Sequence, residues 1–330
     1  MPYLGGILMN NNQVSHFNNS SSGFTLIELI ISLVLGLLVS AAVIQVYIIS
    51  ARTSVVQQSA SEVQDTTIFA LQAVDDHIRL ANLGNPISNI TSTTPHSGIV
   101  LTTNNLGNSN ATDEKYLTVS ADSDGWTGLS NIVGIESDQL TIQYKNITSA
   151  SLYDCEGTEI ASGSSDWVVE RYFIRKATGG AATDLVLACA AGRVDEEGAI
   201  VTAFTGTGFT GTGEVIIPAV DQFKVLLGTM TDVSQLSYMP ANTYLTLTEK
   251  PAITTIKLGV IVRSTTPLIE DPESELATED KGKFVVLGTE QKLNTVSMNE
   301  NYYRRSYEST ITLRSARVMS VTGLKSNVTS

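Results

Sequence analysis

The first pattern along the chain is a long apolar stretch near the N-terminus. From Leu29 to Ala51 no residue carries a charge, and the few polar side chains are one amide, one phenol and three small hydroxyls. A helix needs roughly 20 apolar residues to cross a bilayer, so the pattern predicts a membrane-spanning helix over residues 24–51. Glu28 stands at its start, and a carboxylate in hydrocarbon costs about 3 kcal/mol or more, which calls for a partner.

An amphipathic pattern continues this helix without a break. Apolar or small residues recur at spacings of seven and four, as one face of a helix requires. They are Val56, Ala60, Val63, Thr67, Ala70, Leu71, Val74 and Ile78. Gly84 favours a left-handed cap and Pro86 cannot continue a helix, so we expect the helix to end at Leu83. Residues 52–84 are therefore predicted to form an amphipathic helix that packs on its own head domain.

The pattern becomes strand-like after residue 84. Short runs that alternate apolar and polar residues are typical of half-buried antiparallel strands, and turn residues separate them. The runs are SGIVLTT, KYLTVSA, DQLTIQYK, DWVVERYFI, TDLVLACA, GEVIIPAVDQFKVLLG, ITTIKLGVIVRS, GKFVVLG and YESTITLRSARV. We therefore predict an α+β protein, in which a long N-terminal helix packs on a mainly antiparallel β head at residues 85–330.

The charge balance of the chain is acidic. Its 330 residues carry a net charge of −13, with only 20 Lys and Arg. Binding to phosphates requires clustered cations, so this balance argues against nucleic acid as a direct partner. The segment YYRRSYE joins aromatic residues to Arg304 and Arg305. It is either a contact for DNA or another protein, or an edge strand whose arginines pair with acids, and the acidic net charge favours the second.

Other motifs do not indicate an enzyme. GTGFTGTG at 206–213 contains G-x-G-x-x-G, but a predicted strand follows it where a dinucleotide site needs a helix, so we expect a hairpin loop. DSDG at 122–125 lacks the rest of a calcium-loop pattern and is expected to be a solvated turn. His77 and His96 belong to no Ser–His–Asp arrangement. We therefore expect no catalytic residues and no cofactor.

The two cysteines, Cys155 and Cys189, lie well beyond the apolar stretch. If the head is exported, an oxidising compartment favours a disulfide between them, whereas the alternative is two buried free thiols. A bridge that closes this loop of about 34 residues would contribute about 4 kcal/mol in the chain-entropy model. Two distant cysteines and three histidines show no metal-ligand spacing, so no metal site is expected.

The segment before the apolar stretch does not match a secretory signal peptide. Such a signal has a basic start, a shorter apolar region and a small-residue cleavage site, whereas here the apolar stretch is too long and Arg52 follows it. Instead, GFTLIEL at 23–29 resembles the processing motif of type IV prepilins. The resemblance implies that a prepilin peptidase removes residues 1–23 as a leader, cutting between Gly23 and Phe24, and then N-methylates Phe24.

The same resemblance gives Glu28 a partner. As the fifth residue of the mature chain, its carboxylate would pair with the amine that cleavage creates at Phe24, in its own or a neighbouring subunit, and so set the register of assembly. The alternative is a carboxylate that reaches the lipid headgroups from the end of a helix. The leader departs from the family habit, because residues 1–23 contain no Lys or Arg.

Later segments resemble the PilW-like minor pilins. These segments are LYDCEG, DWVVERYFIRK, TDLVLACA, IIPAVDQFKVLLGTMTD, ITTIKLGVIVRSTTP and YRRSYESTITLRSARV. The resemblance implies a type IV pilin-like fold and a structural subunit of the type IV pilus, in its tip or priming complex. Pilus assembly and twitching motility would depend on it, with DNA uptake or adhesion as further roles.

The resemblance also implies partners and a location. The partners would be other minor pilins, the major pilin, the prepilin peptidase and the inner-membrane assembly platform. The chain would cross the inner membrane once, with its head in the periplasm, before it enters the pilus at the cell surface. The alternative is a J-type pseudopilin of a type II secretion system, because pilins and pseudopilins share the N-terminal motif.

Overall fold

The computed structural model describes six parts of the chain, which are residues 23–107, 117–121, 123–202, 213–232, 235–268 and 282–314. The predicted leader before Gly23, most of the GTGFTGTG loop and the first residue of the DSDG turn lie outside the described residues. The chain divides into two compact units, Met1–Ala51 and Arg52–Ser330. Each unit is described by itself below.

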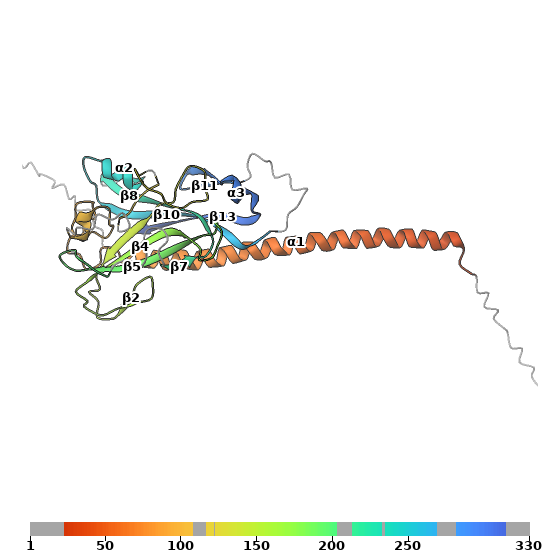
Figure 1. Ribbon diagram of the computed structural model, residues 1–330, viewed down its shortest axis with the longest axis horizontal. Coiled ribbons are helices and arrows are strands. Elements are labelled where there is room, and N and C mark those ends of the chain that lie inside the picture. The colour runs from red at the N-terminus through yellow and green to blue at the C-terminus, as the bar shows by residue number, and fades with distance from the viewer. Residues whose placement is uncertain are drawn as a thin grey trace, which may run out of the picture. The chain divides into compact units, whose positions relative to one another are not determined.

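Helix α1 runs from Leu26 to Ile78 (Figure 1). Thr25 caps its start, because the Thr25 hydroxyl accepts a hydrogen bond from the backbone N–H of Glu28 at 3.3 Å. Glu28 lies in the first turn, where the positive end of the helix dipole favours an acidic side chain. Two residues of the prepilin-like motif thus also serve as an ordinary helix start.

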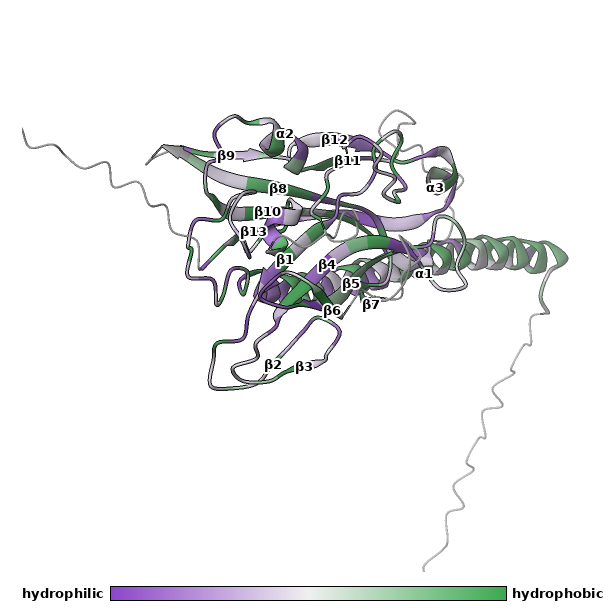
Figure 2. Cartoon of the chain, turned by 60° about the vertical axis from the view of Figure 1, so that its left-hand side comes forward, coloured by the Kyte–Doolittle hydropathy of each residue, from purple (hydrophilic) through white to green (hydrophobic). Residues whose placement is uncertain are grey.

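The part of α1 in the first unit is apolar on every side, and Figure 2 colours it hydrophobic. Its length and composition are those of a helix that can cross a membrane, as the sequence predicts. The part of α1 in the second unit is amphipathic and buries only one face. Its buried residues are Ser59, Val63, Thr67, Leu71, Val74 and Ile78. The predicted stripe is therefore confirmed from Val63 onward but is wrong at Val56, which is exposed.

The end of α1 differs from the prediction, since the helix stops at Ile78 and not at Leu83. The backbone N–H groups of Leu80 and Ala81 bond to carbonyls three residues back, which tightens the last turn. The N–H of Asn82 then leaves the helix and donates to the Gln143 carbonyl at 2.9 Å. A hydrogen bond to the sheet thus replaces the next helical one, and residues 79–84 form turns.

The first main sheet of the head is antiparallel and has five strands in the order β1-β4-β5-β6, with β7 also paired to β5; Figure 2 labels all five. Its strands are β1 (Leu140–Tyr144), β4 (Trp167–Lys176), β5 (Leu185–Val194), β6 (Ile200–Thr202) and β7 (Glu214–Ile217). Strand β4 is buried on both faces. Val168 and Tyr172 face the core that contains α1, whereas Val169 and Phe173 belong to a second cluster on the other face.

The second main sheet has four antiparallel strands in the order β13-β10-β8-β9. They are β8 (Val220–Asp232), β9 (Gln235–Met239), β10 (Ile253–Pro267) and β13 (Tyr302–Thr312). Two small hairpins pair β2 (Leu152–Tyr153) with β3 (Glu159–Ile160) and β11 (Lys283–Val286) with β12 (Thr289–Lys292). Three short helical turns complete the described head: η1 (Thr103–Leu106), α2 (Ala241–Thr246) and α3 (Thr295–Asn299).

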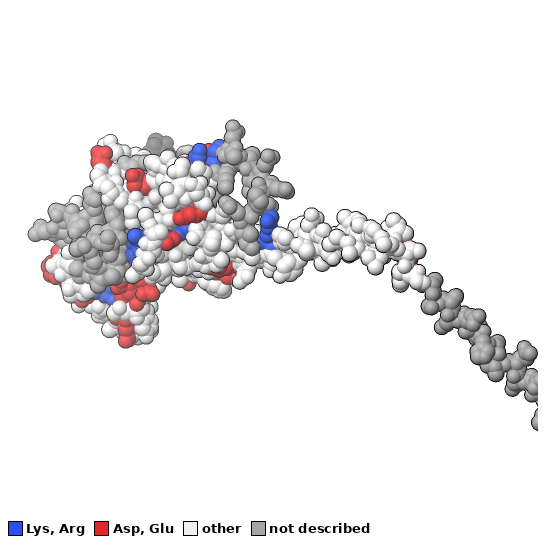
Figure 3. Space-filling model, turned by 45° about the vertical axis from the view of Figure 1, so that its right-hand side comes forward, with Lys and Arg blue, Asp and Glu red and all other residues white. Residues whose placement is uncertain are grey.

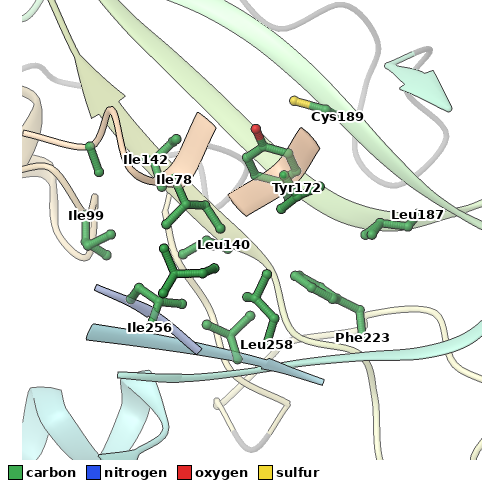
Figure 4. Close-up of a cluster of buried hydrophobic side chains, with 14 of the residues drawn as sticks. Ile78, Ile99, Leu140, Ile142, Tyr172, Leu187, Cys189, Phe223, Ile256 and Leu258 are labelled. Carbon is green, nitrogen blue, oxygen red and sulfur yellow. The ribbon is translucent and has the colours of Figure 1, made fainter. Parts of the chain in front are cut away.

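One hydrophobic core joins α1 to both main sheets. Figure 4 shows Ile78 of α1 together with Leu140 and Tyr172 of the first sheet and Phe223 and Leu258 of the second, all of them buried. A long N-terminal helix followed by an antiparallel β head is therefore confirmed as the fold. The head forms around the helix, since side chains of α1 supply one part of the core.

Two of the predicted strands are wrong. SGIVLTT and the described part of KYLTVSA form only isolated bridges, Ile99 with Ile142 and Val119 with Gln139. Val100 and Leu106 from this region pack against the second face of β4 instead. Their apolar character thus reflects a loop that covers a sheet, and not a strand within it.

Candidate functional site

Gly23 and Phe24 precede the helix at a fully accessible point of the first unit. A Cβ atom at Gly23 would meet no heavy atom within 4 Å, and the φ angle there is not left-handed. The described fold therefore does not itself require glycine at this position. Phe24 is 82% exposed, so both residues are open to another protein.

The helix after Phe24 presents a continuous apolar surface. Residues 24–50 are all exposed within the described chain, and most of them are Leu, Ile, Val or Ala. Figure 3 shows that charged side chains gather on the head, whereas this part of α1 is nearly free of them. Burying one such large aliphatic side chain contributes about 1.5–3 kcal/mol, so the surface requires an apolar environment such as lipid or other helices.

Cys155 and Cys189 are joined by a disulfide, with their Cα atoms 6.1 Å apart. Cys155 lies in the turn between β2 and β3, and Cys189 lies in the middle of β5. The turn is held a second time, because Asp154 accepts a hydrogen bond from the Arg193 guanidinium at 2.5 Å. The β2–β3 hairpin is thus fixed to β5 by a disulfide and an ion pair, and the Glu156 carboxylate of the same turn also accepts a hydrogen bond from the Ala191 backbone N–H.

A buried carboxylate lies beside this disulfide. Glu170 of β4 is 0% exposed and accepts four hydrogen bonds. Oε1 accepts from the Tyr144 hydroxyl at 2.8 Å, the Cys155 backbone N–H at 3.0 Å and His77 Nδ1 at 3.1 Å, and Oε2 accepts from the Tyr172 hydroxyl at 2.8 Å. We call these five residues the Glu170 cluster. An unpaired buried carboxylate is costly, and this one is supplied with donors from a helix, two strands and a turn.

The Glu170 cluster shifts the protonation of its members. Burial by itself lowers the pKa of His77, but the hydrogen bond to Glu170 and the charges of Glu170, Asp154 and Asp76 outweigh it and raise this pKa above the ordinary 6.5. Burial and the neighbouring Glu170 charge raise the pKa values of Tyr144 and Tyr172, so both hydroxyls stay protonated and can donate. The cluster therefore favours a protonated His77.

Two members of the Glu170 cluster, together with Cys189, carry atoms of the kinds that metals bind. A sulfur of each cysteine and an oxygen of Glu170 lie within 4.8 Å of one another. Zinc binds thiolates, however, and a disulfide offers none. In the oxidised protein these atoms therefore serve as a structural contact.

The YYRRSYE segment lies in β13 at the edge of the second main sheet. The side chain of Arg304 is 7% exposed and donates from Nε to Asp221 at 2.8 Å, with further bonds to the backbone carbonyls of Glu300 and Ser297. Arg305 is exposed and lies 5.5 Å from the ring of Tyr307. The prediction of an edge strand whose arginines pair with acids is thus confirmed for Arg304.

Sequence reasoning missed His77 and Glu170 as members of one site. The available signal was a single acid at an inward position, since Glu170 alternates with Val168 and Tyr172 along β4. A lone inward acid predicts that some partner exists. It does not identify His77, which lies 93 residues away.

A long, exposed apolar helix with a processing motif at its start and an antiparallel β head define a pilin-like protein. Two family comparisons agree with this class. The prokaryotic N-terminal methylation motif matches residues 18–44, and the family of type IV pilus-assembly protein W, PilW, matches residues 171–315. The resemblance to type IV prepilins and to PilW-like proteins is therefore confirmed. The matches support a minor pilin of the type IV pilus, and because pilins are structural proteins they imply a protein that is not an enzyme.

Comparison with individual proteins adds little. No curated protein matches the chain. Among solved structures, a type IV-like pilin from Thermus thermophilus aligns with a TM-score of 0.34 and 10% sequence identity, covering 77% of this chain and 97% of its own.

Proposed function

We propose that the chain is a minor pilin that acts in the tip or priming complex of a type IV pilus. The observation that supports this proposal most strongly is that one chain carries both the methylation motif and the PilW-like segment. The first is common to pilins and pseudopilins, and the second favours the pilus. The large head also suits a cap position better than repetition along a thin shaft.

In this proposal, prepilin peptidase cuts between Gly23 and Phe24 and methylates the new amine of Phe24. The exposed position of both residues supports access by such an enzyme. The chain then stays in the inner membrane through the apolar half of α1, with its head in the periplasm. An oxidising periplasm agrees with the disulfide between Cys155 and Cys189.

Glu28 is proposed to guide assembly. Its carboxylate lies at the start of an otherwise uncharged surface, where an unpaired charge is unfavourable in lipid or among packed helices. The amine of Phe24, in the same or a neighbouring subunit, supplies the opposite charge. The Glu28 carboxylate and the Phe24 amine would lie within reach of each other only when neighbouring subunits have the correct axial offset. The ion pair would therefore favour that arrangement of subunits.

The partners would be other minor pilins, the major pilin and the inner-membrane assembly platform. Twitching motility would follow from pilus assembly, and DNA uptake or adhesion would be further consequences of a pilus tip. The apolar helix and the prepilin motif fit membrane anchoring and a pilus, which is the setting that these partners require.

A deletion strain tests the proposal against the J-type pseudopilin alternative. We expect the deletion to abolish surface pili and twitching while protein secretion stays normal, and a plasmid copy of the gene to restore both losses. Normal pili together with a block in type II secretion would overturn the proposal and favour the pseudopilin. A plasmid copy with Glu28→Ala serves as the matched comparison for assembly.

A further inference from the structure

We propose that the Glu170 cluster couples the Cys155–Cys189 disulfide to the docking of α1 on the head, so that each favours the other. The inference rests on the proposed function only for the oxidising compartment in which the disulfide forms. It assigns a redox-sensitive device to the head: a reduced head holds its helix less firmly than an oxidised one.

The four donors of the cluster are not equally fixed. Tyr144 and Tyr172 belong to β1 and β4, whose backbones pair in a ladder, so they stay beside Glu170 as long as the sheet exists. Cys155 and His77 come from outside the sheet, one from the β2–β3 turn and one from α1. Both donate to the same oxygen, Oε1. The disulfide-bonded turn and α1 are therefore both hydrogen-bonded to Oε1 of Glu170.

The disulfide determines where the Cys155 backbone N–H lies. Its other half, Cys189, pairs directly with Tyr172 across the β4–β5 ladder, so the bridge ties the turn to β5, the strand next to the one that carries Glu170. After reduction the turn is still linked to β5 by the ion pair between Asp154 and Arg193, and by the Glu156 carboxylate, which accepts a hydrogen bond from the Ala191 backbone N–H. A displaced turn withdraws one donor from a buried carboxylate, and such a group is unfavourable when it is left short of partners.

His77 determines whether the helix end stays in place. It lies between Val74 and Ile78, which are 1% and 0% exposed in the core, and its ring is partly buried. The Asp75 carboxylate beside it accepts from the Ser309 hydroxyl of β13 at 2.7 Å. The last turn of α1 is thus docked by packing and by two polar contacts, and the one to Glu170 is the one that the disulfide influences.

Coupling of this kind is reciprocal, which makes it measurable from either side. Reduction should loosen the end of α1, and loss of the His77 contact should make the disulfide easier to reduce. Reduction by dithiothreitol transfers two electrons and two protons to the two sulfurs, while dithiothreitol closes to its cyclic disulfide. No other reactant is required.

The first experiment measures the disulfide's midpoint potential in the full-length chain in detergent micelles, using dithiothreitol redox buffers. EDTA is present throughout, because the reduced thiols and Glu170 contain metal-binding atoms within 4.8 Å of one another. The variants are His77→Gln and, as the matched control, His96→Gln. His96 is also a histidine of the head, but it contacts Gln143, the Glu196 carbonyl and the Trp167 ring, and not the Glu170 cluster.

We expect His77→Gln to shift the dithiol–disulfide equilibrium about tenfold toward the dithiol, a rise of about 30 mV in midpoint potential. His96→Gln should leave the potential at the wild-type value. Glu170→Gln should act in the same direction as His77→Gln if it folds; if it does not, the comparison of the two histidine variants decides. Equal potentials for wild type, His77→Gln and His96→Gln would overturn the proposal.

The second experiment measures hydrogen exchange of the α1 amides over residues 71–78 in the oxidised and reduced wild-type chain. We expect faster exchange in the reduced form, and a much smaller difference between the two forms in His77→Gln. If the disulfide has a local structural role only, its reduction should change hydrogen exchange around the β2–β3 turn but leave the exchange rates of residues 71–78 unchanged. That result would contradict the coupling. Both readouts use purified protein, so their failure is distinguishable from failure of the pilus assignment.

Discussion

His77, in the last turn of α1, donates from Nδ1 to Oε1 of Glu170 on β4 across 3.1 Å. This contact joins the helix to the sheet on which it packs, and it lies next to the disulfide of the head. The last turn of α1 is therefore part of the pilin-like head. It supplies one of the hydrogen-bond donors of the buried Glu170 carboxylate.

The first prediction concerns pH. The raised pKa of His77 means that the folded state holds the imidazole proton more tightly than the unfolded chain does. The stabilisation from this contact should be fully present below about pH 6.5, the usual histidine pKa, and should disappear as pH rises through the folded-state value. Thermal unfolding of wild type and His77→Gln at a series of pH values measures it. A difference in melting temperature that does not change with pH would contradict the expectation.

The second prediction compares two adjacent arginines. Arg304→Ala removes the closest cation from Asp221, which is fully buried and keeps Asn131 and the more distant Arg263, and should lower the free energy of unfolding by about 3 kcal/mol. Arg305→Ala removes an exposed guanidinium over Tyr307 and should cost about 1 kcal/mol or less. Urea unfolding of both variants in the same detergent tests this contrast. If both variants lose a similar amount of unfolding free energy, the ion pair between Arg304 and Asp221 is not the main contribution of this segment to stability.

The third prediction concerns assembly. Glu28→Gln keeps the size of the side chain but removes its charge, and breaking a buried ion pair costs about 3–5 kcal/mol. Cleavage should stay largely intact, whereas incorporation into sheared pili should fall at least about tenfold. Gln45→Ala, a change of another polar residue in the same apolar helix, is the control and should leave incorporation near normal. Wild-type incorporation of the Glu28→Gln protein would exclude a register role for this charge.

The fourth prediction concerns processing. Gly23→Ala should cause the precursor to accumulate, although a Cβ atom at this position meets nothing within 4 Å in the described chain. The expected defect therefore reflects recognition by the peptidase and not the fold. Gly36→Ala is the matched control, since that glycine also has open space around it and lies inside the apolar helix. Immunoblots that show normal mature protein for Gly23→Ala would mean that the cleavage site is elsewhere.

Much of the fold follows from local patterns in the sequence. The spacing of Val63, Leu71, Val74 and Ile78 identifies the docked face of α1, because side chains three and four positions apart share one side of a helix. The period also explains why Val56 was expected in this face. That residue lies outside the described core, so periodicity identifies a face of the helix without showing how far the head extends along it.

Other features depend on contacts between distant residues. The end of α1 is set by the bond from Asn82 to Gln143, and the runs SGIVLTT and KYLTVSA become loop because they cover a sheet that already has its strands. The two-residue strands β2 and β3 are too short for any alternation to be visible. The pairing of His77 with Glu170 is of the same kind, since neither sequence neighbourhood contains information about the other.

The mass of the mature protein's N-terminal peptide tests the central claim most directly. If the chain is a processed type IV pilin, the first residue of the mature protein is Phe24, and its peptide is heavier by one methyl group on the α-amine. Mass spectrometry of protein purified from membranes or pili measures this, with a peptidase-deficient strain as the control that retains the leader. An unmethylated N-terminus, or a first residue other than Phe24, would contradict the account.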